Sequence, residues 1–146
     1  MKIESLGHVV LRVTDCPRAE RFYNGVLGLP ICARLDKDGF RMTFFSLGNH
    51  HDFAVMEVSG EDGVRGDSSP GLHHVAFKIG NDLEKLREAK AALEAAGIAP
   101  RPIDHEVTKS LYFADPDGNG VEVYVDASDA WRGEPQRVAQ IAPLAL

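Results

Sequence analysis

The sequence predicts an α+β fold in which two βαβββ modules pair to form a curled mixed sheet. The first observation is a repeat: the segment SLGHVVLRV recurs as GLHHVAFKI, and aligning the two places His8 on His74. The second is that each copy continues with a helical apolar pattern and then with strand-like segments. The third is a Gly- and Asp-rich link, residues 59–71, which separates the copies.

We expect the first module to span residues 3–58. Its strand GHVVLRV leads into a helix, for which Thr14 or Asp15 can provide the N-terminal cap and Pro17 suits the first turn. Two or three strands should follow, in LPICARLD, FRMTFFSLG and HDFAVMEV. The apolar residues of this helix recur at helical spacing: Phe22, Val26 and Leu29.

The second module, residues 72–127, repeats this order. The strand HHVAFKIG precedes a helix in which Asn81 or Asp82 is the cap and Gly97 the end. Strands should follow around PRPIDHE, KSLYFADP and GVEVYVD, with a tight turn at DPDGNG. A tail, residues 128–146, lies outside the repeat and could form a short helix. The apolar stripe of the helix comprises Leu83, Leu86, Ala89 or Lys90, and Leu93.

Composition restricts the class of protein. The 146 residues are the size of one domain, so we expect a single domain over 1–146, because neither module alone has enough apolar surface for a core. A net charge of −6 without any basic run argues against nucleic-acid binding. No segment reads as a signal peptide or a membrane span. We expect Cys16 and Cys32 to be reduced thiols of a cytoplasmic protein.

Three segments, GHVVLRVTD, HHVAFKI and above all SLYFADPDGNGVEVYV, resemble the vicinal oxygen chelate superfamily. This group includes glyoxalase I, fosfomycin-resistance proteins, methylmalonyl-CoA epimerase and extradiol dioxygenases. The resemblance covers residues 3–127, and its D-P-D-G-N-x-x-E element is specific for the superfamily but not for one activity. It implies that Glu122 is a metal ligand and that the paired modules curl round a metal cleft.

His8, His74 and Glu122 together make a set of two histidines and one carboxylate. Such a set leaves up to three coordination positions open, which suits Fe(II) with a bidentate substrate and dioxygen. Mn(II), Ni(II) or Zn(II) would fit the same ligands, because ligand identity alone does not select the metal. The alternative is that His8 and His74 are core histidines satisfied by hydrogen bonds. We expect His73, as the neighbour of His74 along a strand, to face the other way.

The ligand count favours some activities over others. Aligning GVEVYV with DFAVMEV puts Ala54 opposite Glu122, so the fourth carboxylate used by glyoxalase I and the epimerase is absent. Glu57 is three residues further on, which places it on the other side of that strand. Three ligands fit the dioxygenases and the fosfomycin-modifying enzymes better.

The resemblance to the dioxygenases implies three catalytic residues. Tyr112 lies ten residues before Glu122, as a tyrosine does in that group. His51, in NHHDFA, matches the histidine that serves as acid and base beside the oxygen site, and His105 matches a second active-site histidine. These residues would help a small catecholic substrate lose a proton. The phenylalanines around them are candidates for a ring pocket or for plain core packing: Phe40, Phe44, Phe45, Phe53 and Phe77.

Two other functions compete with an Fe(II) extradiol-type dioxygenase. The first is a metal-dependent lyase or transferase of the glyoxalase or fosfomycin type, for which Lys109, Ser110 and Arg41 are isolated anion-binding candidates. The second is a metal-free small-molecule binding protein, as in bleomycin-sequestering members, which typically lose the metal ligands. All three ligands are present here, so we rank it last. In each case we expect a homodimer, whose metal site could lie within one chain or across two.

Overall fold

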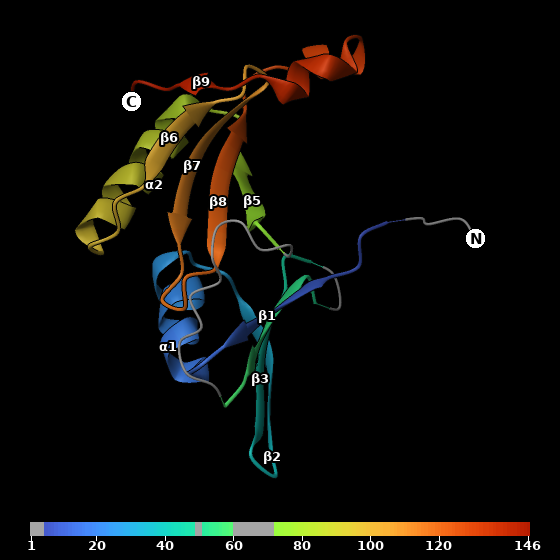
Figure 1. The fold of residues 1–146 in the computed structure, drawn as a ribbon, viewed down its shortest axis with the longest axis vertical. Helices are drawn as coiled ribbons and strands as arrows, with labels where there is room; N and C mark the ends of the chain where they lie inside the picture. The colour runs from blue at the N-terminus through green and yellow to red at the C-terminus, as the bar shows by residue number, and fades with distance from the viewer. Residues whose placement is uncertain (1–4, 49–50, 60–71) are drawn as a thin grey trace. The chain divides into compact units, whose positions relative to one another are not determined.

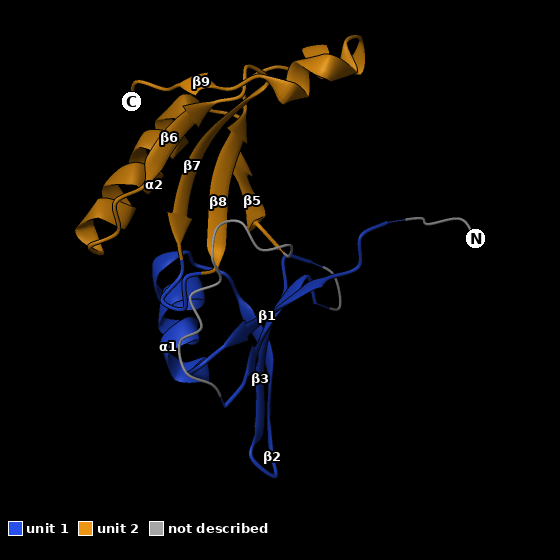
Figure 2. Cartoon of the chain, viewed as in Figure 1, with its two compact units in different colours: residues 1–69, 115–118 blue, residues 70–114, 119–146 orange. Residues whose placement is uncertain are grey.

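A computed structural model describes residues 5–48, 51–59 and 72–146 of the chain (Figure 1). All but the first residue of the predicted link 59–71 therefore lies outside the described residues. The chain divides into two compact units (Figure 2). Unit 1 comprises Met1–Ser69 and Asp115–Gly118, and unit 2 comprises Pro70–Ala114 and Asn119–Leu146.

Unit 1 contains a four-stranded mixed sheet in the order β1-β4-β3-β2. β1 pairs with β4 in parallel, and the β2–β3 and β3–β4 pairs are antiparallel. The helix between β1 and β2 completes the predicted βαβββ order. The elements are β1 (Val9–Val13), α1 (Cys16–Glu20), the π-helical η1 (Arg21–Val26), β2 (Ile31–Lys37), β3 (Phe40–Phe45) and β4 (Phe53–Glu57).

The first helix begins at Asp15, one of its two predicted caps, but does not continue as a regular α-helix. Asp15 is the cap, and its carboxylate accepts a hydrogen bond of 2.7 Å from the main-chain N–H of Arg18. From η1 onward the turns widen to π-helical. Phe22 and Tyr23 are then buried at consecutive positions, with their rings edge to face at 4.9 Å. Consecutive side chains point about 100° apart around an α-helix. Around the wider π-helical turns this angle is smaller, which helps both rings face the core.

The core of unit 1 lies between this helix and one face of the sheet. Every second residue of a strand points to the same face, and on the face toward α1 and η1 the strands β3 and β4 bury Thr43, Phe45, Phe53 and Val55 almost completely. Phe45 and Phe53, both at 0–1% exposure, contact the ring of Tyr23. These two phenylalanines are therefore core residues rather than part of a ring pocket.

Unit 2 repeats the arrangement with a five-stranded sheet in the order β5-β8-β7-β6-β9. β5 and β8 are parallel, as β1 and β4 are in unit 1. α2 lies along one face of the sheet, where it contacts β5, β7 and β8 (Figure 1). The elements are β5 (His74–Gly80), α2 (Leu83–Ala95), β6 (Arg101–Asp104), β7 (Thr108–Ala114), β8 (Gly120–Asp126), η2 (Ala130–Arg132), η3 (Pro135–Ala139) and β9 (Ala142–Pro143).

The second helix follows the sequence closely. Asp82 is its cap, accepting a hydrogen bond of 2.9 Å from the N–H of Glu84. Leu86 and Leu93, two members of the predicted stripe, are buried against the sheet. Gly97, with a φ of 78°, ends the helix as predicted, because its N–H bonds back to the carbonyl of Glu94.

The turn between β7 and β8 belongs to unit 1. Asp115 accepts a hydrogen bond of 2.8 Å from the hydroxyl of Tyr23. One carboxylate oxygen of Asp117 accepts from the main-chain N–H and the hydroxyl of Thr14 and pairs with Arg18 at 2.7 Å. The two acidic residues of the predicted DPDGNG turn are therefore structural anchors of the first helix.

The tail forms two short 3₁₀ helices and then β9, which pairs antiparallel with β6. The prediction of a short helix was incomplete, because it did not include this added edge strand. Cys16 is buried and Cys32 is exposed, and the two are not joined in a disulfide. Within the described part of the chain, no helix combines the length and the apolar character needed to cross a membrane.

Candidate functional site

The strand register confirms the alignment of the two modules. Val10, two residues after His8, pairs with Ala54. Ala76, two residues after His74, pairs with Glu122. His8 and His74 are thus at equivalent places in the two units, and Ala54 stands where unit 2 has Glu122. Ala54 is completely buried and provides no ligand atom, so the fourth carboxylate is absent at that position.

In unit 2, His74 and Glu122 are brought together. The Nε2 atom of His74 is 3.0 Å from Oε2 of Glu122, whose side chain is only 9% exposed. Two ligand atoms that bind one ion at about 2.1 Å and at right angles to each other lie about 3 Å apart. An imidazole nitrogen and a carboxylate oxygen are also donors that divalent transition metals accept. This pair therefore fits two adjacent ligands of a metal.

Tyr112 lies directly beside this pair, because β7 and β8 place it opposite Glu122 in the antiparallel register. Its ring meets that of His74 edge to face at 5.3 Å. Burial, together with the hydrogen bond that the phenol donates to Glu122, raises the pKa of Tyr112 well above its ordinary value. The hydroxyl consequently stays protonated near neutral pH.

His105, in the turn between β6 and β7, extends the series of contacts. Its Nε2 atom is 2.9 Å from the hydroxyl of Tyr112. On the other side of the ring, Nδ1 is 2.8 Å from the main-chain oxygen of Gln140 in the tail. Four predicted site residues of unit 2 thus form one connected group: His74, Glu122, Tyr112 and His105.

His73 is placed differently from the prediction. β5 begins at His74, so His73 precedes the strand and the alternation of strand faces does not apply to it. Its Nδ1 atom is 2.7 Å from Nδ1 of His74. The structure therefore adds two groups to this site that sequence reasoning missed, His73 and the carbonyl of Gln140. The doubled histidine was a signal for the first, whereas no sequence signal indicates a main-chain acceptor.

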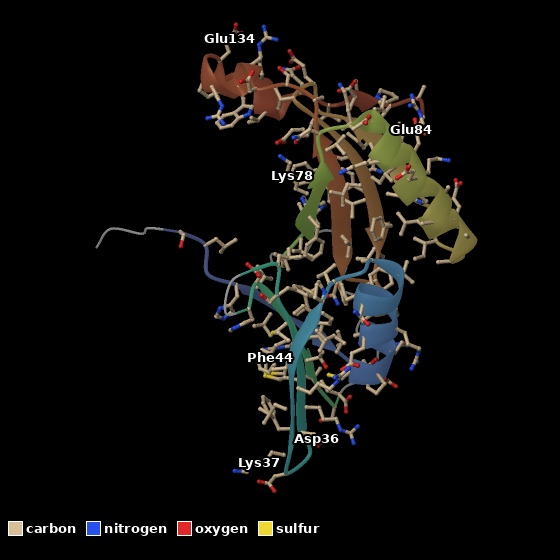
Figure 3. The ribbon with its side chains drawn as sticks, turned by 180° about the vertical axis from the view of Figure 1, so that it is seen from behind. Asp36, Lys37, Phe44, Lys78, Glu84 and Glu134 are labelled. Atoms are coloured by element: carbon tan, nitrogen blue, oxygen red, sulfur yellow. The ribbon has the colours of Figure 1, made fainter. Side chains whose placement is uncertain are left out.

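In unit 1, the other two predicted residues lie together. The rings of His8 and His51 are stacked, with centroids 4.2 Å apart and planes tilted by 35°. The ring of Phe44 meets His51 edge to face at 5.3 Å. Phe44 projects from β3 on the side of the sheet away from α1 (Figure 3). Phe44, one of the candidate ring-pocket residues, therefore contacts a predicted catalytic residue.

The neighbouring charged residues have structural partners. Glu57 lies on the opposite side of β4 from Ala54, as predicted, and accepts a hydrogen bond of 2.8 Å from the N–H of Cys16. Lys109 pairs with Asp104, and Arg41 pairs with Asp36 at 3.1 Å. Both cations proposed for an anion-binding cluster are thus neutralised.

The six predicted site residues are divided between the units. His8 and His51 belong to unit 1, whereas the other four belong to unit 2. Among the described residues of either unit taken alone, His, Cys, Asp and Glu side chains form no group of three that could hold a metal. The complete set of His8, His74 and Glu122 therefore remains a prediction.

Comparisons with known proteins place the chain among its relatives. Residues 5–123 match the model of the glyoxalase/bleomycin resistance protein/dioxygenase superfamily. Biphenyl-2,3-diol 1,2-dioxygenase 2 of Rhodococcus globerulus is 33% identical over 82% of this chain and 62% of its own length. Biphenyl-2,3-diol 1,2-dioxygenase 3 of the same organism is 34% identical over 94% of this chain and 75% of its own. The chain thus spans less than two thirds of the first of these relatives.

Relatives with other activities also match. The metallothiol transferase FosB of Lysinibacillus sphaericus is 28% identical over 85% of this chain and 84% of its own. A structure of the fosfomycin resistance protein FosX of Listeria monocytogenes, in complex with Mn(II) and sulfate, has a TM-score of 0.68. It is 20% identical and covers 91% of this chain and all of its own, so it shows a shared fold. The family match, the repeated βαβββ order and the relatives agree: the chain belongs to the glyoxalase/bleomycin resistance protein/dioxygenase superfamily.

Proposed function

We propose that this protein is a metal-dependent extradiol-type dioxygenase, which opens the ring of a small catecholic substrate with Fe(II) and O₂. The observation that carries the proposal is the connected series Glu122, Tyr112 and His105. It joins a predicted metal ligand to a phenol and then to an imidazole within hydrogen-bond distance. This is the apparatus that a catechol needs if it is to lose a proton as it binds.

The metal would be held by His74 and Glu122 of unit 2 and by His8 of unit 1. His8 could come from the same chain or from the second chain of a homodimer. Bound Fe(II) would neutralise the charge of the catecholate and hold it next to dioxygen. Mn(II), Ni(II) and Zn(II) are alternatives for the same ligands.

The chain's own residues would manage the protons. The hydroxyl of Tyr112, which burial and Glu122 keep protonated, can donate a hydrogen bond to a catecholate oxygen. Nε2 of a neutral His105 can take up a proton that passes through this hydroxyl. His51, stacked on His8 and bordered by Phe44, would donate a proton on the oxygen side of the substrate.

The test begins with protein purified without oxygen and measured for metal content. A panel of catechols is then followed by oxygen uptake and by the absorbance of ring-opened products. We expect iron-dependent uptake, which Tyr112→Phe lowers in kcat by about a hundredfold or more. Tyr124→Phe, on the neighbouring strand, is the matched control and should keep its activity. Iron-loaded protein that consumes no oxygen with any catechol would contradict the proposal.

A metal-dependent transferase or lyase is the second candidate. One observation favours it: the chain spans 84% of FosB but only 62% of the first dioxygenase. The pairing of Lys109 with Asp104 and of Arg41 with Asp36 speaks against a phosphonate site. Thiol-transfer and glyoxalase assays with Mn(II), Ni(II) and Zn(II) distinguish this candidate. A protein that binds no metal at all would instead support a small-molecule binding protein.

We also propose that the protein is a cytoplasmic homodimer. Cys16 and Cys32 are not joined in a disulfide, which agrees with a reducing compartment. His8 belongs to unit 1, whereas His74 and Glu122 belong to unit 2, so in a homodimer one metal site could draw on both chains. Light scattering of the purified protein tests the oligomeric state, and a monomeric mass would contradict the dimer.

A further inference from the structure

The tail beyond the family match contributes a main-chain contact to the candidate site. The match ends at residue 123, whereas η3 and β9 lie later in the chain. β9 pairs with β6, matching Ala142 with Asp104 and Pro143 with Ile103. β6 leads directly into His105, so this pairing holds the tail along the strand that carries the histidine.

The contact itself restricts the proton on His105. Nδ1 is 2.8 Å from the main-chain oxygen of Gln140. A carbonyl oxygen can only accept a hydrogen bond, so Nδ1 must carry hydrogen for the contact to form. In a neutral imidazole the other nitrogen, Nε2, then has a free lone pair. The Tyr112 hydroxyl, 2.9 Å away, has one hydrogen, which it can donate either to Glu122 or to this lone pair.

The main chain around His105 is also fixed. Its N–H donates to the carbonyl of Thr108 at 3.0 Å, and its own carbonyl accepts from the N–H of Val107 at 2.7 Å. The imidazole can still rotate about its side-chain bonds, and it can exchange its proton between the two nitrogens. Among the described contacts of this ring, the carbonyl of Gln140 is the partner that can only accept and so requires Nδ1–H, whereas the Tyr112 hydroxyl can donate or accept.

We propose that the C-terminal tail is a positioning element of the candidate site: the carbonyl of Gln140 holds His105 as the Nδ1–H tautomer, with Nε2 facing Tyr112. The proposal deepens the proposed dioxygenase and, for its effect on turnover, rests on it. With Nε2 bare, His105 can accept a proton through the Tyr112 hydroxyl. With the opposite tautomer, Nε2–H would donate to that hydroxyl and could not accept.

The test compares the full chain with two shortened chains and one point variant. One ends at Ala139 and lacks Gln140 and β9. The matched control ends at Pro143, which keeps both and removes only residues 144–146. β9 is exposed and η3 contains no buried residue, so we expect the shortened chains to fold. Circular dichroism checks that they are folded. The point variant is Ala142→Pro, which disturbs the β9 pairing in the full chain.

The first measurement is the tautomer of His105 in metal-free protein, from ¹⁵N–¹H spectra across a pH series. His105→Gln assigns its signals. We expect the neutral ring to be Nδ1–H in the full chain and in the control ending at Pro143. In the chain ending at Ala139 and in Ala142→Pro, the Nε2–H tautomer should become substantially populated. A full chain with Nε2–H, or an unchanged tautomer after loss of the tail, would overturn the proposal.

The second measurement separates this proposal from the dioxygenase assignment. If catechol cleavage is observed, loss of the tail should lower kcat by about tenfold or more and leave KM nearly unchanged, as for a general acid–base residue. An unchanged kcat beside an altered tautomer would overturn the role in turnover. The tautomer experiment uses neither metal nor substrate. It therefore shows whether the tail sets the tautomer even if the protein has no dioxygenase activity.

Discussion

The hydroxyl of Tyr23 donates a buried hydrogen bond of 2.8 Å to the carboxylate of Asp115. Tyr23 is completely buried, and Asp115 is 5% exposed. One partner lies in the first helix of the chain and the other in the turn between β7 and β8. The family motif around that turn thus has a structural role in unit 1 in addition to leading into the predicted ligand Glu122.

Removing the hydroxyl of Tyr23 should destabilise the fold. Tyr23→Phe keeps the ring in place but removes the hydrogen bond that the phenol donates to the buried carboxylate of Asp115. We expect the free energy of unfolding in urea to fall by about 1–3 kcal/mol. Tyr124→Phe, at a half-buried ring of unit 2, should change it by less than about 0.5 kcal/mol. Equal stabilities of the two variants would show that the Tyr23 hydroxyl contributes nothing.

The same pair predicts how stability responds to alkali. Burial, and next the nearby charge of Asp115, raises the pKa of Tyr23 above its ordinary value of 10.0. The folded protein therefore holds the phenol proton more tightly than the unfolded chain does. This stabilising contribution is complete below about pH 10 and is lost as the pH rises further. We expect stability above pH 10 to fall more steeply in the wild type than in Tyr23→Phe, as measured by urea unfolding.

A small substitution at the start of β8 should damage the candidate metal site. A Cβ atom at Gly120 would lie 2.2 Å from the main-chain oxygen of His73 and 3.1 Å from Cβ of His74. Gly120→Ala must therefore displace the main chain that carries His74, lowering both thermal stability and metal affinity. Gly25→Ala, where a Cβ meets nothing within 4 Å, is the control and should be neutral. Wild-type behaviour of Gly120→Ala would show that this close approach is relaxed in solution.

If His74 binds a metal through Nε2, then His73 should tune the site. The other nitrogen of His74 is 2.7 Å from His73, which can accept its hydrogen and orient the ring. His73→Ala should weaken binding by about 10- to 100-fold in a competition titration with a chelator. His74→Ala and Glu122→Gln should abolish it, and Lys78→Ala on the same strand should leave it unchanged. Full affinity in His74→Ala would place the metal elsewhere.

Acid stability should depend on a cluster beside the first helix. Two hydrogen bonds of 2.8 Å from Arg34 lower the pKa of Glu20 below its ordinary value of 4.5, and a further bond from Thr43 acts in the same direction. The folded state thus binds this proton less readily, so the contribution is present above pH 4.5 and is lost as the pH falls below it. Arg34→Gln should flatten the decline in stability at acid pH. Arg87→Gln, in the exposed pair with Glu84, should retain the wild-type decline.

Much of the fold could be predicted because its signals are local. The cap at Asp82, the stripe through Leu86 and Leu93, and the end of the helix at Gly97 each depend on a few neighbouring residues. The π-helical turns at Phe22 and Tyr23 were not predicted, because they arise from burial of both rings in the tertiary core. The same holds for β9: a two-residue strand leaves no periodic pattern and forms only because β6 is beside it.

The site was predicted to a similar extent. The repeat and the family motif indicated His74, Glu122, Tyr112 and His105, and the structure brings these four together. The spacing between Tyr112 and Glu122 across a turn could not show that they face each other, because only the register of β7 and β8 decides it. The contribution of Gln140 could not be predicted, since any residue has the same main-chain oxygen.

The order in which the chain visits its two units affects how it can be divided and how it folds. Unit 1 is completed only when residues 115–118 have been added, after most of unit 2 has already been made. A fragment that stopped at the link between the modules would lack the carboxylate that Tyr23 requires. Co-expressed halves should therefore regain unit 1 only by association. During synthesis on the ribosome, its last core hydrogen bond must wait for the second half of the chain.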